Sequence, residues 1–385
     1  MIAALTGRLR RVTNGQVWIP QIDGLRFLAI AAVLLFHLWG QVDVRSGRIL
    51  PIEDRYYLFH LFAGNADRGV RLFFVISGFV LALPFARHHL AGARPVLLRN
   101  YYMRRVTRLE PPYLISLLLL TLMVGVWTHS FGLDLWRHSA ASALYLHNGI
   151  YGSVSTINMV AWSLETEVQF YVLAPLLMQV FRVGNVWVRR GFLLLLILAC
   201  GPLGTAALHS PHTESSLLRY LGYFLGGLLT ADFFVLGAPL DRQAPRFDAY
   251  GFLLLLIAFS VPHDSEAVHS LLPLVFAGLC LASMRGPLFN RVLSQPAIAV
   301  IGGMCYSIYL LHMAVIAMVF KGSKYLISTH LDFMGNYIIQ CIILIPCVLV
   351  ACTAFYLVVE RPCMDPRWPS KLRQHLTRTV APIHS

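Results

Sequence analysis

Long apolar stretches recur along this sequence, and short polar segments separate them. A helix needs about 20 residues to cross a hydrocarbon core of ~30 Å. Ten stretches approach that length, and the seventh and eighth are the weakest because HDSEAVHS separates two short runs. The pattern therefore predicts an all-α, polytopic integral membrane protein with about ten transmembrane helices. The predicted spans are residues 20–40, 69–86, 112–128, 161–181, 191–208, 218–236, 249–262, 270–284, 296–320 and 336–358.

The basic residues of the loops are distributed unequally between the two sides of these spans. If the N-terminus lies in the cytoplasm, 21 Lys and Arg residues fall on the cytoplasmic side and nine on the other, with Arg26 left out of the count. Cytoplasmic loops of membrane proteins are enriched in Lys and Arg, so we expect both termini in the cytoplasm. The expected organisation is a basic N-terminus over 1–19, one transmembrane domain over 20–360 and a basic tail over 361–385, in the inner (cytoplasmic) membrane.

The overall composition agrees with this organisation. The chain is 57% hydrophobic and only 13% charged, with a mean hydropathy of +0.65, whereas soluble domains are about a quarter charged. The net charge of +13 does not indicate nucleic-acid binding, because the basic residues form short clusters between apolar runs. Six of the seven cysteines lie inside apolar runs, and no His, Cys or carboxylate cluster has metal-ligand spacing. We therefore expect neither a disulfide framework nor a metal site nor a bound cofactor.

Two ionisable residues stand in the first apolar stretch, DGLRFLAIAAVLLFH, which runs from Asp23 to His37. Each helical residue turns ~100° and rises ~1.5 Å, so Arg26 and His37 lie within about 20° of one face and ~16 Å apart along the axis. Arg26 could extend to the headgroups and His37 could be an ordinary core histidine. Ionisable groups inside a bilayer are costly, however, and usually mark function, so the pair is a candidate site.

A second cluster, RNYYMRRVTRLEPPY, covers residues 99–113 at the cytoplasmic entry to the third span. Arg105 and Arg108 are three residues apart and share a helical face, and guanidinium groups form bidentate bonds to phosphate. This cluster could equally be an anchor that contacts anionic lipid. Pro111 and Pro112 are expected to start or break a helix here.

A third cluster, AWSLETEVQFYVLAPLL, covers residues 161–177. Trp162 is typical of a membrane interface, and acidic residues near a helix N-terminus suit its dipole. Glu167 shares a face with Ser163 and Tyr171 and could meet His37 there.

The ninth predicted span contains a further polar group in CYSIYLLHMAV, where Tyr309 and His312 share a face. Asp232 and Arg71 also fall in apolar surroundings, but we expect them near span ends in structural roles.

The ordered set of motifs resembles the membrane-bound acyltransferase family 3. The matching stretches are IDGLRFLAIAAVLLFH, GVRLFFVISGFVLA, RRVTRLEPPY, WSLETEVQFY and SIYLLH, followed by a last span that ends in ERP. They cover nearly the whole chain. The resemblance implies a membrane enzyme that transfers an acyl group, often acetyl, from cytoplasmic acyl-coenzyme A to a sugar hydroxyl. Many relatives carry a fused outer hydrolase-like domain; this chain is expected to be a stand-alone version, and Arg71 stands where the family often has an acidic residue.

The resemblance places the family's functional residues on particular positions of this chain. His37 is expected to be a general base or a transient acyl carrier, with Glu167 as its orienting partner. Arg26, Arg105 and Arg108 are expected to bind the donor. The supporting residues are Asp23, Tyr113, Trp162, Ser163, Tyr171, Ser307, Tyr309 and His312.

Two other classes of function remain open from the residues alone. Arg26, His37 and Glu167 could form the proton relay of a transporter or flippase for a sugar-containing substrate. A membrane scaffold is the third alternative, and it would leave the buried ionisable groups unexplained. The acceptor could be a cell-surface polysaccharide, a lipid-linked sugar or a small glycoside, and the sequence predicts no oligomeric state.

Overall fold

The computed structural model describes residues 18–46, 56–237, 243–261, 266–365, 368 and 370, and these form helices and no strands. The prediction of an all-α fold is confirmed. Short 3-10 helices cover Ala66–Arg68, Met178–Arg182 and Lys324–Leu326, and a π-helical turn covers Tyr356–Glu360. The α-helices are α2 (Pro20–Ser46), α3 (Tyr57–Gly64), α4 (Gly69–Ala91), α5 (Leu98–Thr128), α6 (Leu133–Ala143), α7 (His147–Tyr151), α8 (Trp162–Leu177), α9 (Val186–Ala207), α10 (Pro211–Glu214), α11 (Leu217–Leu236), α12 (Pro245–Ser260), α13 (Glu266–Arg285), α14 (Pro287–Leu293), α15 (Pro296–Gly303), α16 (Cys305–Ser323), α17 (Phe333–Phe355) and α18 (Arg361–Cys363).

Seven helical segments among the described residues are long and apolar enough to cross a membrane, by length and composition. They contain α2, α4, α5, α9, α13, α16 and α17. The other three predicted spans correspond to α8, α11 and α12, of which α8 and α12 have only 16 residues each. The predicted number of about ten spans and the cytoplasmic placement of both termini therefore stay predictions.

The expectation that Pro111 and Pro112 start or break a helix is wrong, because α5 runs through both of them. A proline lacks the N–H that would bond to the carbonyl four residues earlier, which for Pro111 is the carbonyl of Thr107. The indole N–H of Trp368 donates to this carbonyl at 2.8 Å. A contact from the far end of the chain thus satisfies an acceptor that the proline leaves open.

The ninth predicted span is divided into α15 and α16, which meet at Met304. Gly302 and Gly303 end α15, and glycine is a weak helix former. A Cβ on Gly302 would lie 1.7 Å from the carbonyl oxygen of Asp23, so the small residue lets α15 touch the backbone of α2.

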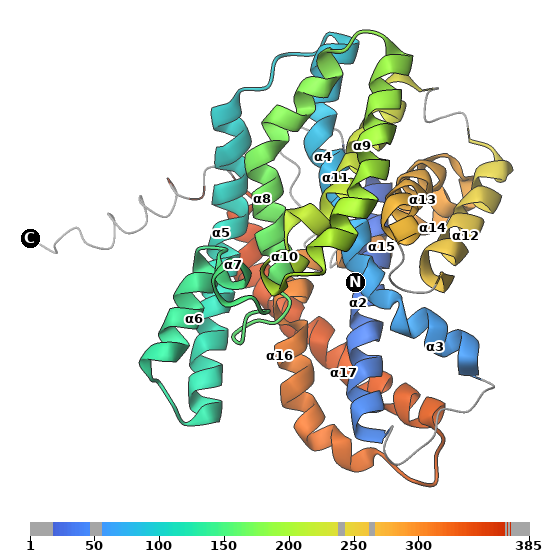
Figure 1. Cartoon of the computed structure of the whole chain (residues 1–385). Coiled ribbons are helices and arrows are strands. Elements are labelled where there is room, and N and C mark those ends of the chain that lie inside the picture. The colour runs from blue at the N-terminus through green and yellow to red at the C-terminus, as the bar shows by residue number, and fades with distance from the viewer. Residues whose placement is uncertain are drawn as a thin grey trace, which may run out of the picture.

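Helix α2 lies at the centre of the bundle, in contact with α4, α15, α16 and α17. Helix α4 in turn packs against α11, and this is the most extensive helix pairing among the described residues. Figure 1 shows α5 and α6 on one side of these central helices and α12 to α14 on the opposite side.

The packing of α4 on α11 depends on two glycines. A Cβ on Gly78 would lie 2.3 Å from the carbonyl oxygen of Phe224, and one on Gly227 would lie 2.3 Å from that of Val75. Small residues let membrane helices approach closely and gain van der Waals contact. This contact fixes the height of α4 relative to its neighbours.

A buried ion cluster joins α9 to α11. Asp232 is fully buried, accepts a bond from Nε of Arg190 at 2.6 Å and is also bonded to Arg189. Both arginines stand near the start of α9, and the carboxylate stands near the end of α11. The cluster supports the structural role expected for Asp232.

Replacing Gly227 with valine should destabilise the fold, since the added side chain would overlap the backbone of α4. Overpacking of this kind costs about 1–3 kcal/mol, and thermal unfolding of the purified protein in detergent measures it. The matched control is Gly191→Ala in α9, where nothing lies within 4 Å of the added Cβ. An unfolding temperature for Gly227→Val equal to that of the control would contradict this account of the packing.

Candidate functional site

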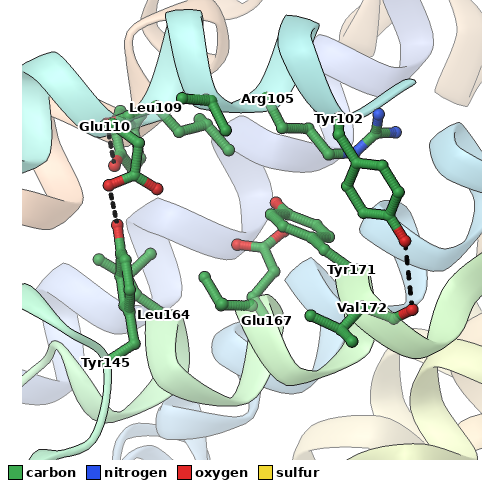
Figure 2. Close-up of a pocket in the computed structure, with 12 residues that line it drawn as sticks. Tyr102, Arg105, Leu109, Glu110, Tyr145, Leu164, Glu167, Tyr171 and Val172 are labelled. Carbon is green, nitrogen blue, oxygen red and sulfur yellow. Dashed lines mark hydrogen bonds between the residues drawn. The ribbon is translucent and has the colours of Figure 1, made fainter. Parts of the chain in front are cut away.

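A pocket of about 200 Å³ lies between α5 and α8. Figure 2 shows Arg105 and Tyr102 at one end, Glu110 and Tyr145 at the other, and Glu167 and Tyr171 between them. Three residues expected from the sequence, Arg105, Glu167 and Tyr171, are thus brought together. The pocket is lined by Tyr102, Arg105, Val106, Leu109, Glu110, Tyr145, Leu164, Glu167, Val168, Tyr171, Val172 and Tyr306.

The carboxylate of Glu167 is held by a hydroxyl group. Ser77 of α4 donates to its Oε1 at 2.5 Å, and the phenol of Tyr171, one turn further along α8, interacts electrostatically with it. Hydrogen bonds to a charged group are stronger than neutral ones. The side chain is therefore fixed on the wall of the pocket.

Two guanidinium groups interact electrostatically with this carboxylate. Arg105 of α5 lies over the ring of Tyr101 at 3.5 Å and is bonded to its carbonyl. Arg26 of α2 donates to Oδ1 of Asp23 at 2.7 Å, and its side chain is only 14% exposed. Cations from two helices thus converge on Glu167 from α8.

Arg108 does not line the pocket. It is half-buried on α5, one turn beyond Arg105. Of the two arginines of this cluster, only Arg105 lines the pocket, and its role in binding a donor stays a prediction. Arg108 stays a predicted donor contact.

His37 stands elsewhere, three turns along α2 from Arg26 and about 16 Å away along the axis. Its ring centroid is 5.2 Å from that of His312 on α16, and it interacts electrostatically with the carboxylate of Asp67. The expected pairing of His37 with Glu167 is not formed in the described structure. The two groups lie at different levels along α2, since Glu167 is near Arg26 and His37 is three turns further along the helix.

Polar residues of α8 and α16 are in contact with one another between Glu167 and His37. Ser163 Oγ and Tyr309 Oη are 2.6 Å apart, and Tyr309 Oη donates to the carbonyl of Val160 at 3.0 Å. Tyr309 is in ring contact with His312, at 5.9 Å between centroids. These contacts extend polar groups from the level of Glu167 toward His37.

Three further predicted residues make structural contacts. Ser307 donates to Oε2 of Glu360 through its backbone N–H at 3.0 Å and through its hydroxyl. Tyr113 donates to the carbonyl of Ser142 at 2.8 Å. Trp162 packs its ring on that of Tyr220, at 5.2 Å. They hold α16, α6 and α8 in place around the site.

Sequence reasoning missed residues that contact the predicted ones. Ser77 is a single hydroxyl in the apolar run FFVISGF, and that isolation was the available signal. Tyr145 stands between α6 and α7 in the left-handed region, with φ 57°. Burial raises the pKa of Tyr145 far above its usual range, so the phenol stays protonated and donates to Glu110 at 3.1 Å. No group of three or more His, Cys, Asp or Glu among the described residues could hold a metal ion.

A family model of an acyltransferase domain matches residues 19–357. The chain belongs to acyltransferase family 3. The resemblance noted from the motifs is confirmed, and membership together with the apolar helices makes this a multi-pass membrane protein. No solved structure matches the chain.

Three relatives show how far the similarity extends. The chain is 25% identical over 336 residues to O-acetyltransferase OatA of Staphylococcus aureus, which covers 80% of this chain and 52% of that protein. It is 26% identical over 353 residues to Peptidoglycan O-acetyltransferase OatA of Listeria monocytogenes, with 80% and 51% covered. Nodulation protein 10 of Rhizobium leguminosarum is 24% identical over 196 residues, with 46% and 48% covered. The chain spans about half the length of these relatives.

Replacing Ser77 with alanine should destabilise the protein, because the carboxylate of Glu167 loses a hydrogen-bond donor. Such a loss costs about 1–3 kcal/mol, and the unfolding temperature in detergent reports it. In Glu167→Gln the same substitution at Ser77 should cost less, since the charge is gone. The matched control is Ser283→Ala in α13, a buried serine that donates only to the backbone carbonyl of Cys280. Equal costs of Ser77→Ala in both backgrounds would contradict the charge-assisted bond.

Proposed function

We propose that this protein transfers an acyl group, in the simplest case acetyl, from cytoplasmic acyl-coenzyme A to a hydroxyl group of a carbohydrate. The observation that carries the proposal is the arrangement of the charged groups and the imidazole. Arg105 and Glu167 line the pocket, Arg26 of α2 interacts electrostatically with that carboxylate, and His37 stands further along α2. Membership of the acyltransferase family and similarity to relatives named as O-acetyltransferases support it.

The donor is proposed to bind with its phosphates at the guanidinium groups of Arg26 and Arg105. Guanidinium binds phosphate in a bidentate manner, and Arg105 is already fixed in place by its contact with Tyr101. Arg108, one turn further along α5 and outside the pocket, is proposed as an additional phosphate contact. Glu167 balances the guanidiniums and keeps them oriented toward the pocket.

The thin pantetheine arm of coenzyme A then extends from the pocket along α2. The ~16 Å between Arg26 and His37 is close to half of a ~30 Å hydrocarbon core. A donor anchored by its phosphates on the cytoplasmic side therefore presents its thioester near His37. In this proposal Arg26 binds the phosphates of the donor and His37 acts on its thioester.

At His37 the acceptor hydroxyl attacks the thioester carbonyl. His37 takes the hydroxyl proton as the new C–O bond forms. The carbonyl oxygen then carries the negative charge of a tetrahedral intermediate. When that intermediate collapses the C–S bond breaks, and the imidazolium returns the proton to the thiolate of coenzyme A. The products are an O-acyl ester and free coenzyme A, with His37 regenerated.

The acceptor is proposed to be a carbohydrate outside the cytoplasm, such as a cell-surface polysaccharide or a lipid-linked sugar. One relative is named as a peptidoglycan O-acetyltransferase. The enzyme would act in the cytoplasmic membrane, with donor and acceptor reaching the site from opposite sides.

Replacing His37 with alanine should reduce transfer from labelled acetyl-coenzyme A by about 10²-fold or more, because general-base catalysis contributes 10²–10⁴. The unfolding temperature should change little, since the ring is half-buried. His129→Ala, at an exposed position after α5, is the matched control. Activity above a few per cent in a folded His37→Ala variant would overturn the assignment. Uptake of a sugar into vesicles without consumption of donor would indicate a transporter instead.

Replacing Arg105 with lysine should raise the KM for acyl-coenzyme A while kcat stays nearly unchanged, because a point charge replaces a bidentate fork. Steady-state kinetics with varied donor at saturating acceptor measure this. Arg104→Lys is the control, since Arg104 is the adjacent exposed arginine and does not line the pocket. An unchanged donor KM in Arg105→Lys would remove the phosphate role from this residue.

A further inference from the structure

His312 is fully buried on α16, and its bonds fix the tautomer of its ring. Nδ1 lies 2.9 Å from the carbonyl oxygens of both Ile308 and Tyr309. A carbonyl oxygen only accepts, so Nδ1 carries the hydrogen. In the neutral ring Nε2 then bears a lone pair, and among the described residues it has no hydrogen-bond partner. A buried acceptor left open in this way costs free energy and calls for an explanation.

One candidate donor to this acceptor is the imidazole of His37. The two ring centroids are 5.2 Å apart and the rings are tilted by 44°. A second pair in the same protein, His138 and His147, has centroids 5.0 Å apart and forms a 2.8 Å bond between ring nitrogens. The rings of His37 and His312 lie at nearly the same separation, which is compatible with a bond of this kind.

We propose that His312 is a positioning residue for His37: its Nε2 accepts the N–H of one ring nitrogen of His37 and leaves the other nitrogen as the base. This inference rests on the proposed function of His37. A neutral imidazole of fixed tautomer can accept a hydrogen bond but cannot also donate from the same atom. His312 therefore selects one tautomer of His37.

The proposed bond between His37 and His312 also stabilises His37 after proton transfer. When His37 takes the hydroxyl proton, both of its nitrogens carry hydrogen, and its bond to His312 becomes charge-assisted and stronger. The carboxylate of Asp67, which interacts electrostatically with His37, offsets the new positive charge. The proton does not move to His312. It is held by His37 until the C–S bond breaks and is then transferred to the thiolate, so His312 orients the base without touching substrate.

Two substitutions at His312 separate this role from a purely structural one. In His312→Asn the side-chain amide nitrogen takes the place of Nδ1 and can still donate to the carbonyls of Ile308 and Tyr309, but no atom replaces Nε2. In His312→Gln the longer amide places an acceptor oxygen near the position of Nε2. Ser323→Ala, on the same helix and bonded to Gln340 at 2.6 Å, is the control for loss of a buried polar contact in α16.

The experiment measures kcat, donor and acceptor KM, and unfolding temperature for the full-length protein in detergent, with labelled acetyl-coenzyme A. We expect His312→Asn to lower kcat about 10- to 100-fold, a part of the 10²–10⁴ that positioned proton transfer contributes, with little change in either KM. His312→Gln should recover most of kcat, and Ser323→Ala should keep it. Unchanged kcat in His312→Asn, or equal losses in both variants that follow a fall in unfolding temperature, would overturn the inference.

A measurement on the unaltered protein covers the case in which the variants do not fold. In protein labelled with ¹⁵N at histidine, a scalar coupling across an N–H···N bond between His37 and His312 is expected, and two uncoupled rings would overturn the inference. The two proposals fail differently. An unaltered protein without donor-dependent transfer overturns the proposed function, whereas transfer that needs His37 but not His312 overturns only the role of His312.

Discussion

The need to compensate charge within an apolar bundle governs the arrangement of the site. An unpaired ionised side chain in such surroundings is costly, so buried charges are found with partners and hydrogen bonds. The guanidinium of Arg26 is paired with Asp23, and the guanidiniums of Arg26 and Arg105 both interact electrostatically with Glu167. Four helices bring these groups together, since Ser77 of α4 also bonds to Glu167. The positions of α2, α4, α5 and α8 are therefore tied to one another by electrostatics as well as by packing.

The central helix α2 holds Arg26 and His37 about 16 Å apart along its axis. At one end Arg26 is paired with Asp23 and interacts electrostatically with Glu167, and at the other end His37 is in ring contact with His312 of α16. Phosphate recognition needs permanent charge, whereas proton transfer needs an imidazole that is free to change its charge. In the proposed function these two tasks fall to Arg26 and His37, and their separation on one helix would keep the guanidinium away from the base.

Much of the helical organisation follows from the sequence, because apolar runs of sufficient length have few alternatives in a membrane. The sequence also singles out Arg26, His37 and Glu167 as candidate site residues, since they are ionisable side chains in apolar surroundings. Which of them meet could not be predicted, because the relative height of two helices is set by contacts such as those of Gly78 and Gly302 with neighbouring backbones. Local rules also failed at Pro111, where the compensating donor is Trp368, more than 250 residues away in sequence.

Ser77 and Gly78 are consecutive residues of α4, and they make contacts with two different helices. The serine bonds to the carboxylate of the pocket, and the glycine lets α11 touch the helix backbone. A shift of α4 along its axis that accommodated a larger residue at position 78 would carry the serine hydroxyl with it. The packing of α4 on α11 and the position of the Glu167 carboxylate thus depend on adjacent residues. In divergent descendants of this sequence, substitutions should therefore accumulate on α12 to α14, away from the pocket, sooner than at this pair.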